Sequence, residues 1–209
     1  MRLEPSLKRT IAFFDGQNLF HAAREAFGYT FPNFNPLTLS QLICLKQNWN
    51  LSEVNFYTGI PRKENDPFWY DFWIIKLAAM GTTGIKTFSR PIRYQSRIVS
   101  LPDGSVRKIS IGQEKGIDVR IALDVVRKAR HVEFDVALIF SQDQDLSEVA
   151  DEVRDISNQQ DRWIKLACAF PVNLTLKKNR GINGMDWIPI TMEMYDSCID
   201  PNDYRPKTK

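Results

Sequence analysis

Histidine and paired cysteines are nearly absent from this sequence. The only histidines among the 209 residues are His21 and His131, and the three cysteines lie far apart with no CxxC pair. This scarcity predicts neither a histidine-rich metal site nor a disulfide framework. Unpaired cysteines of this kind favour a reducing compartment.

Long apolar segments are also lacking. The amino-terminal sequence MRLEPSLKRT has no apolar stretch of the kind that secretory signals contain. No apolar run approaches the roughly 20 residues that a helix needs to cross a bilayer. We therefore expect a soluble, cytoplasmic protein with no membrane partner.

Common nucleotide-binding motifs are missing too. The chain contains no GxxxxGKS or GxxxxGKT phosphate loop and no strong GxGxxG motif. Its net charge of +3 permits a nucleic-acid partner without arguing strongly for one. Hydrophobic residues make up 43% and charged residues 25% of the chain, as in ordinary globular proteins. The length predicts one domain over residues 1–191, followed by a peripheral or partly disordered tail over 192–209.

Short apolar segments alternate with helical ones along the chain. This alternation predicts an α/β fold with three layers, α/β/α, around a mostly parallel central sheet. A turn signal at Pro102-Asp103-Gly104 predicts a hairpin over 97–111. The expected strands are 11–14, 54–58, 85–88, 136–140, 163–169 and a possible edge strand at 187–190. The expected helices are 17–27, 37–47, 67–81, 115–130 and one ending near 156.

Acidic residues follow two of the buried-type strands. Asp15 ends the first strand, with Asn18 one turn later, and Asp143 and Asp145 follow the strand 136–140. A third acidic position, Asp118, lies in the first turn of the helix 115–130. Ligands of parallel sheets bind outside the carboxyl ends of the strands, so these groups are expected to meet at one edge.

Each acid also has a simpler structural interpretation. Asp15, and the pair Asp143 and Asp145, could cap the helices that follow them. Asp118 could simply favour the positive end of its helix. Gathered carboxylates raise one another's pKa values, and a divalent cation with oxygen ligands, Mg²⁺ or Mn²⁺, removes that cost. Such a metal activates water and stabilises charge on a phosphate, so the chemistry implied is phosphodiester hydrolysis.

Three stretches, taken together and in order, carry a family resemblance. They are FDGQNL at 14–19, KGIDVRIALD at 115–124 and SQDQDL at 141–146. In these motifs the chain resembles the NYN domain family of the PIN-like nuclease superfamily, over roughly residues 10–170. The resemblance implies a PIN-like fold and a metal-dependent endoribonuclease that uses Mg²⁺ or Mn²⁺.

The resemblance also assigns residues by position. It implies that Asp15, Asp118, Asp143 and Asp145 form the metal-binding acidic cluster, and that Asn18 helps to hold a water or a substrate phosphate. The family's third motif has glycine where Gln142 stands and an aromatic residue where Leu146 stands. Gln142 either narrows the site or adds a polar contact.

Three further residues belong to or flank the second motif. Asp124 matches a family position, but it lies six residues beyond Asp118 and therefore points to a different face of the helix. We interpret it as structural or supporting. Glu114 and Lys115 precede the helix and are expected to form a solvated ion pair, with phosphate contact by Lys115 as the alternative.

A basic segment precedes the acidic helix. Between 85 and 110 there are six basic residues and one acid, interleaved with Phe88 and Tyr94. Basic side chains neutralise phosphates and aromatic rings stack on unpaired bases, so this segment could guide single-stranded RNA to the acids. The alternative is a solvated basic hairpin. The expected RNA-binding residues are Lys86, Arg90, Arg93, Arg97, Arg107, Lys108 and Lys115.

Two other functions compete with the ribonuclease. The first is a PIN-like adaptor that binds RNA or protein with little or no catalysis, and a homodimer is possible in either case. The second is a phosphatase with an aspartate nucleophile. That chemistry usually wants a second acid two residues after Asp15, where this sequence has Gln17.

Overall fold

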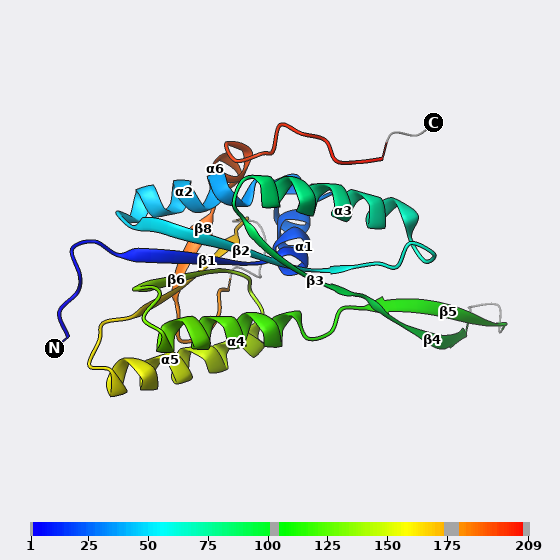
Figure 1. Cartoon of the computed structure of the whole chain (residues 1–209). Helices are drawn as coiled ribbons and strands as arrows, with labels where there is room; N and C mark the ends of the chain where they lie inside the picture. Colours follow the sequence, from blue (N-terminus) through cyan, green and yellow to red (C-terminus); the bar gives the residue numbers. More distant parts are fainter. Residues whose placement is uncertain (1, 101–104, 174–179, 207–209) are drawn as a thin grey trace.

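A computed structural model describes residues 2–100, 105–173 and 180–206 of the chain. Its central element is a six-stranded sheet in which every described strand pair is parallel. Helices cover both faces (Figure 1), so the three-layer α/β/α arrangement expected from the sequence is confirmed. In spatial order the strands are β3 (Lys86–Pro91), β2 (Asn50–Ile60), β1 (Arg9–Asp15), β6 (Val136–Phe140), β7 (Lys165–Pro171) and β8 (Asp186–Ile190).

The strand order reverses next to β1. The chain steps outward from β1 to β2 and β3 on one side, then continues with β6, β7 and β8 on the other. The carboxyl ends of β1 and β6 therefore lie at a topological switch point, the usual place for a ligand in such sheets. Among the described strands, β8 pairs with β7 alone, and Pro189 is tolerated there because an edge strand leaves some amides unpaired.

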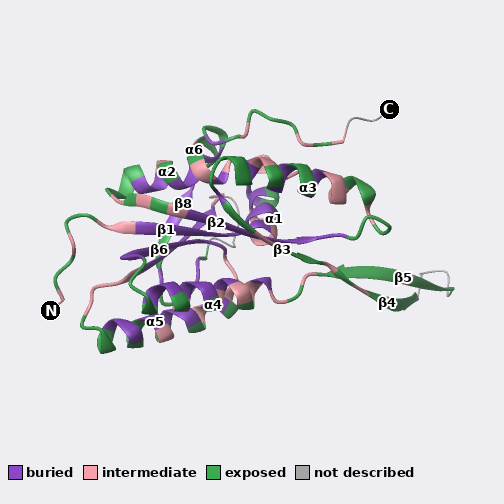
Figure 2. Ribbon diagram, viewed as in Figure 1, coloured by how far each residue is buried: buried purple, intermediate pink, exposed green. Residues whose placement is uncertain are grey.

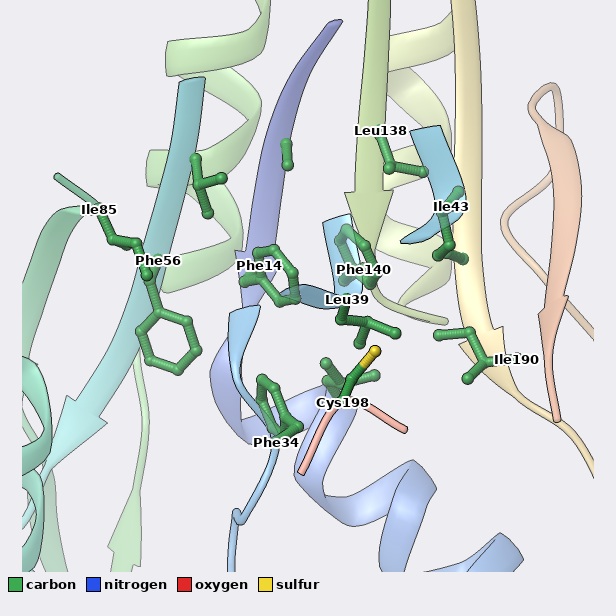
Figure 3. Close-up of a cluster of buried hydrophobic side chains, with 14 of the residues drawn as sticks. Phe14, Phe34, Leu39, Ile43, Phe56, Ile85, Leu138, Phe140, Ile190 and Cys198 are labelled. Carbon is green, nitrogen blue, oxygen red and sulfur yellow. The ribbon is translucent and has the colours of Figure 1, made fainter. Parts of the chain in front are cut away.

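One helical layer is attached to an aromatic-rich core. Alternate residues of β1 and β6 point into it, and the rings of Phe14 and Phe140 stack with centroids 3.8 Å apart (Figure 3). A polar cap starts each of the three long helices of this layer, since Asp15, Asn35 and Asp66 accept hydrogen bonds from their first turns. The helices are α1 (Gly16–Phe27), α2 (Pro36–Gln47), α3 (Pro67–Thr82) and the short α6 (Met192–Asp196).

The other layer consists of α4 (Ile117–Arg130) and α5 (Glu148–Gln159). The 3-10 turn η1 (Gln144–Ser147) directly precedes α5. These helices pack on the opposite face of the sheet, against a second core that contains Phe13 and Ile139. The expected aromatic helix 67–81 and amphipathic helix 115–130 are both present within two residues of their predicted limits. No helix in the described part of the chain is long and apolar enough to cross a membrane.

A two-stranded hairpin projects from the body of the domain. β4 (Arg93–Ser100) and β5 (Val106–Gln113) pair in antiparallel fashion and extend beyond the sheet (Figure 1). Most of their described residues are exposed (Figure 2). The hairpin is longer than the predicted 97–111, and its predicted turn at 102–104 lies outside the described residues.

The segment after residue 191 is more closely integrated than the sequence suggested. Tyr195 is fully buried, and its hydroxyl donates a 3.0 Å hydrogen bond to Asn33 Oδ1. Cys198 is 3% exposed and belongs to the same core. The expectation of a peripheral tail from residue 192 is therefore wrong for these positions, because an aromatic ring and a thiol fill the end of the α1–α2 layer.

Candidate active site

Four carboxylates gather beside the carboxyl ends of β1 and β2. Asp15 ends β1, Asp143 follows β6, and Asp118 lies in the first turn of α4. Glu114 sits between the hairpin and α4. The charges of Asp118 and Asp143 act on Asp15, and those of Asp15 and Asp118 act on Glu114. The structure thus brings three of the sequence-predicted acids together and adds a fourth.

Asp15 combines capping with burial. Its Oδ1 accepts a 3.0 Å hydrogen bond from the amide of Asn18, so the simple capping interpretation is correct as far as it goes. The side chain is nevertheless deeply buried, with the residue 5% exposed. Burial, together with the charges of Asp143 and Asp118, raises the pKa of Asp15 to about 6, against the lowering effect of the Asn18 amide.

Glu114 is the site residue that sequence reasoning missed. It was expected to form a solvated ion pair with Lys115. Instead its Oε2 accepts a hydrogen bond from the amide of Gly59, at the end of β2. Burial first, and then the charge of Asp15, raises the pKa of Glu114 to about 7. The available signal was Gly59 at the end of an expected strand, but nothing in the sequence links it to a residue 55 positions later.

Gly59 leaves the space that Glu114 occupies. A Cβ at this position would lie 2.4 Å from Glu114 Oε2 and 3.0 Å from its Cγ. The carbonyl of Gly59 accepts a 3.3 Å hydrogen bond from Gln17 Nε2, which connects β2 to the start of α1. Gly59 therefore joins both of its backbone polar groups to side chains at the site.

Asn18 organises the loop after β6. Its Oδ1 accepts a 2.8 Å hydrogen bond from the amide of Gln142, which ties the start of α1 to that loop. The Gln142 side chain, in the position where the resemblance implies glycine, donates to the carbonyl of Arg180 at 2.9 Å. Gln142 therefore ties the loop after β6 to the backbone of Arg180.

Asp145 differs from the other predicted acids. Its amide donates a 3.0 Å hydrogen bond to Asp143 Oδ1, so Asp143 caps the η1 turn. Asp145 itself is exposed, and it is not among the charges that raise the pKa of Asp15. The structure places it on the rim rather than in the cluster.

The described residues give the cluster no cationic partner. Among the described residues, no lysine or arginine forms an ion pair within 4.0 Å of the four carboxylates. Equally, within the described ranges no group of three His, Cys, Asp or Glu side chains is arranged to hold a metal ion. The oxygen donors suit a hard divalent cation, and a buried aspartate beside like charges would be relieved by one, but the carboxylates would have to draw closer to ligate it.

Asp124 has a structural role, as interpreted from its position on the helix. It is 6% exposed, and its carboxylate accepts hydrogen bonds from the Tyr57 hydroxyl at 3.0 Å and from Arg120 Nε at 2.8 Å. Arg127 adds a third at 3.1 Å. Arg120 and Arg127 balance the negative charge of Asp124, and the bond from Tyr57 attaches α4 to β2.

The predicted RNA-binding residues divide into three groups. Arg90 lies at the site, since a Cβ on Gly116 at the start of α4 would be 2.5 Å from its Nη1. Lys86 is at the other end of β3, in an ion pair with Glu53, and the structure does not bring it to the acids. The remaining five are exposed: Arg93, Arg97, Arg107 and Lys108 on the hairpin, and Lys115 before α4.

The hairpin register sorts its basic residues by face. Arg93 and Arg97 share one face with Arg107, because Val99 pairs with Arg107 and alternate residues of a strand point the same way. Lys108 pairs with Ile98 and lies on the opposite face. Three of the four basic positions therefore form one row along the hairpin.

Comparison with protein families matches residues 9–159 to the NYN domain. Among solved structures, a protein of unknown function from Vibrio parahaemolyticus is 18% identical, with a TM-score of 0.54 over 90% of this chain and 96% of that one. This likeness concerns the fold alone. MurG of Acinetobacter baumannii matches at 9% identity and a TM-score of 0.32, over 87% of this chain and 45% of that one, and carries no argument. No curated protein matches.

Proposed function

This chain belongs to the NYN domain family, and we propose that it is a metal-dependent endoribonuclease acting on single-stranded RNA. The family is nuclease-like, which supports a hydrolase in general terms. The metal, the RNA substrate and the residue roles are our proposal.

One observation carries the proposal most directly. A buried aspartate, Asp15, is placed beside two other acids at a sheet switch point, with no cation from the described protein to neutralise it. An arrangement that costs stability in the isolated protein is typical of functional sites. A bound divalent cation is the simplest group that would repay the cost.

The proposed ligands are Asp15, Asp118 and Asp143, and Glu114 is a further carboxylate beside them that could accept a proton. A bound Mg²⁺ or Mn²⁺ would supply charge stabilisation at the phosphate and a more acidic water. Asn18 holds the loop that carries Asp143, so we assign it a positioning role rather than a direct phosphate contact. Asp145 is proposed as a rim residue whose loss costs less.

Arg90 is the proposed phosphate contact nearest to the acids. Its guanidinium lies beside the start of α4 and over the ring of Phe88, with Cζ 5.5 Å from the ring centroid. Arg90 is exposed, and an arginine there can neutralise a phosphate oxygen with a paired guanidinium contact. The row formed by Arg93, Arg97 and Arg107 would extend that contact along the hairpin.

The adaptor function is a second candidate because of one observation. The described residues contain no group already arranged to hold a metal. If the carboxylates do not draw together, the same surface would bind RNA through Arg90 and the hairpin without cleaving it.

Cleavage of a labelled single-stranded RNA in Mn²⁺ separates these two functions. We expect the parent protein to cleave, the Asp15→Asn and Asp143→Asn variants to lose most activity, and EDTA to abolish it. Asp155→Asn serves as the matched control, since Asp155 is exposed on α5. Retained RNA binding with no cleavage in the parent protein would support the adaptor instead.

A further inference from the structure

A pocket lies next to the acidic cluster, between α1, α3 and the base of the hairpin. Its volume is about 360 Å³, within the range of small-molecule sites. Four aromatic side chains from these three elements contribute to its wall: Phe20, Trp69, Trp73 and Tyr94. No other described pocket has this density of aromatic rings.

The pocket and the acidic cluster share their framework. In three places a residue of the pocket wall is two positions from a carboxylate of the cluster or from Gly59, whose amide donates to Glu114, so their Cα atoms are at most about 7 Å apart. The hydrogen bond from Gln17 Nε2 to the Gly59 carbonyl also connects two of these places directly. The three pairs are Gln17 with Asp15, Pro61 with Gly59, and Gly112 with Glu114.

Polar groups complete the pocket. Asp66 lies in the wall, where one of its oxygens accepts a 3.1 Å hydrogen bond from the amide of Trp69. The Arg24 guanidinium lies 5.8 Å from the centre of the Phe20 ring, and His21 contacts the same ring at 5.4 Å. Flat apolar walls with a few donors and acceptors suit a heteroaromatic ring better than a phosphate, a metal or an alkyl chain.

We propose that this pocket takes one unpaired nucleobase of the RNA, next to the phosphate held at the acids; the inference rests on the proposed function. The base stacks against the aromatic wall while the backbone crosses the edge formed by Gln17 and Gly59. Arg24 lies on the pocket side and can contact the neighbouring phosphate. Stacking of this kind accepts several bases, so the pocket sets the position of the strand more than its sequence.

Abasic scanning tests the proposal without changing the protein. Short single-stranded RNAs, each with one abasic ribose at a successive position, are titrated against the parent protein in EDTA, so that cleavage does not interfere. We expect one position, or two adjacent ones, to weaken binding by about 5- to 100-fold, while the others change it little. Equal losses at every position, or no loss anywhere, would overturn the proposal.

Variants connect that position to the pocket. Tyr94→Ala is expected to erase the difference between abasic and intact RNA, and Tyr94→Phe to restore it, because stacking needs the ring but not the hydroxyl. Ile74→Ala is the matched control, since Ile74 is exposed on α3 outside this pocket. An unchanged abasic effect in Tyr94→Ala would place the base elsewhere.

Photo-crosslinking gives a measurement that does not depend on a variant folding. RNA carrying 4-thiouridine at the sensitive position should crosslink to peptides containing Trp69 or Tyr94. Crosslinks confined to other peptides would contradict the proposal. Cleavage without any abasic dependence would contradict the base-binding pocket but not the ribonuclease function. Abasic-dependent binding without cleavage would contradict the ribonuclease function but not the base-binding pocket.

Discussion

Asp15 and Asp135 are both buried aspartates on the same sheet, yet their surroundings are opposite. Asp15 is 5% exposed at the carboxyl end of β1, and Asp135 is 7% exposed just before β6. Burial alone would raise the pKa of Asp135, but hydrogen bonds and charge from Arg9, with the charge of Arg162, hold it below its ordinary value. The pKa of Asp15 is raised to about 6.

The two ends of this one sheet therefore serve different purposes. At the amino ends of the strands, Asp135 accepts bonds from both the backbone and side chain of Arg9, which attaches the start of β1 to β6. At the carboxyl ends, Asp15 is left with other acids. The first arrangement stabilises the fold, and the second keeps charge available for a ligand.

Giving the carboxyl-end cluster a counter-ion should change activity more than any other substitution. Asp118→Lys should place a cation beside Asp15, lower the pKa of Asp15 and reduce cleavage on the order of 10²- to 10³-fold, because an internal cation competes with the metal. The cleavage rate and a carboxyl NMR titration of Asp15 measure the two effects. Asp118→Asn is the control that removes charge without adding it, and an Asp15 pKa equal in both variants would contradict this explanation.

Removing the charge of Asp135 should lower the stability of the protein instead. Asp135→Asn leaves Arg9 and Arg162 with weaker partners, and we expect the free energy of unfolding to fall by about 2–3 kcal/mol. Denaturant unfolding measures this loss. Cleavage by the folded protein should stay within about twofold of the parent, and a larger loss of cleavage would show that the two ends of the sheet are coupled.

Neutralising Asp15 should have the opposite effect on stability. Because its pKa in the folded protein is about 6 and the ordinary value is 3.8, the native state binds more protons between these pH values. Stability therefore falls as pH rises from about 4 to 6, and the cost persists above that range. At pH 8 in EDTA, Asp15→Asn should be more stable than the parent by about 1–3 kcal/mol, and at pH 4 the difference should shrink. If Asp15→Asn were less stable than the parent at pH 8, the charge of Asp15 would not be uncompensated in the folded protein.

The smallest effect concerns the space beside Glu114. Gly59→Ala puts a Cβ where the carboxylate now lies, so we expect cleavage to drop about tenfold as Glu114 is displaced. Gly81→Ala on α3 is the matched control, because a Cβ there meets nothing within 4 Å. In a helix that substitution should stabilise by about 0.4–1 kcal/mol without changing cleavage. Equal cleavage in the two variants would show that Glu114 has no role in cleavage.

Much of this molecule follows from its sequence. The alternation of apolar strands and helices predicted the layers and the parallel sheet, and acids after strands pointed to one edge because parallel strands end together. Glu114 escaped prediction because its position depends on a hydrogen bond across the fold to Gly59. Tyr195 escaped it because a short polar-flanked segment carries no periodicity that marks its ring as buried.

The basic residues show the same limit. Lys86 and Arg90 are four positions apart in one basic segment, but β3 runs from the amino edge of the sheet to the carboxyl edge between them. One is therefore paired with Glu53, and the other lies beside the start of α4. Charge counting along the sequence does not separate them, whereas strand direction does.

Calorimetric titration with Mn²⁺ at pH 7.5 tests most directly whether the acids beside Asp15 form a cation site. The parent and Asp135→Asn proteins should bind Mn²⁺ equally well at one site per chain. Asp15→Asn and Asp143→Asn should each weaken that binding by at least about tenfold. Mn²⁺ binding that is unchanged in Asp15→Asn, or absent from the parent protein, would contradict the account.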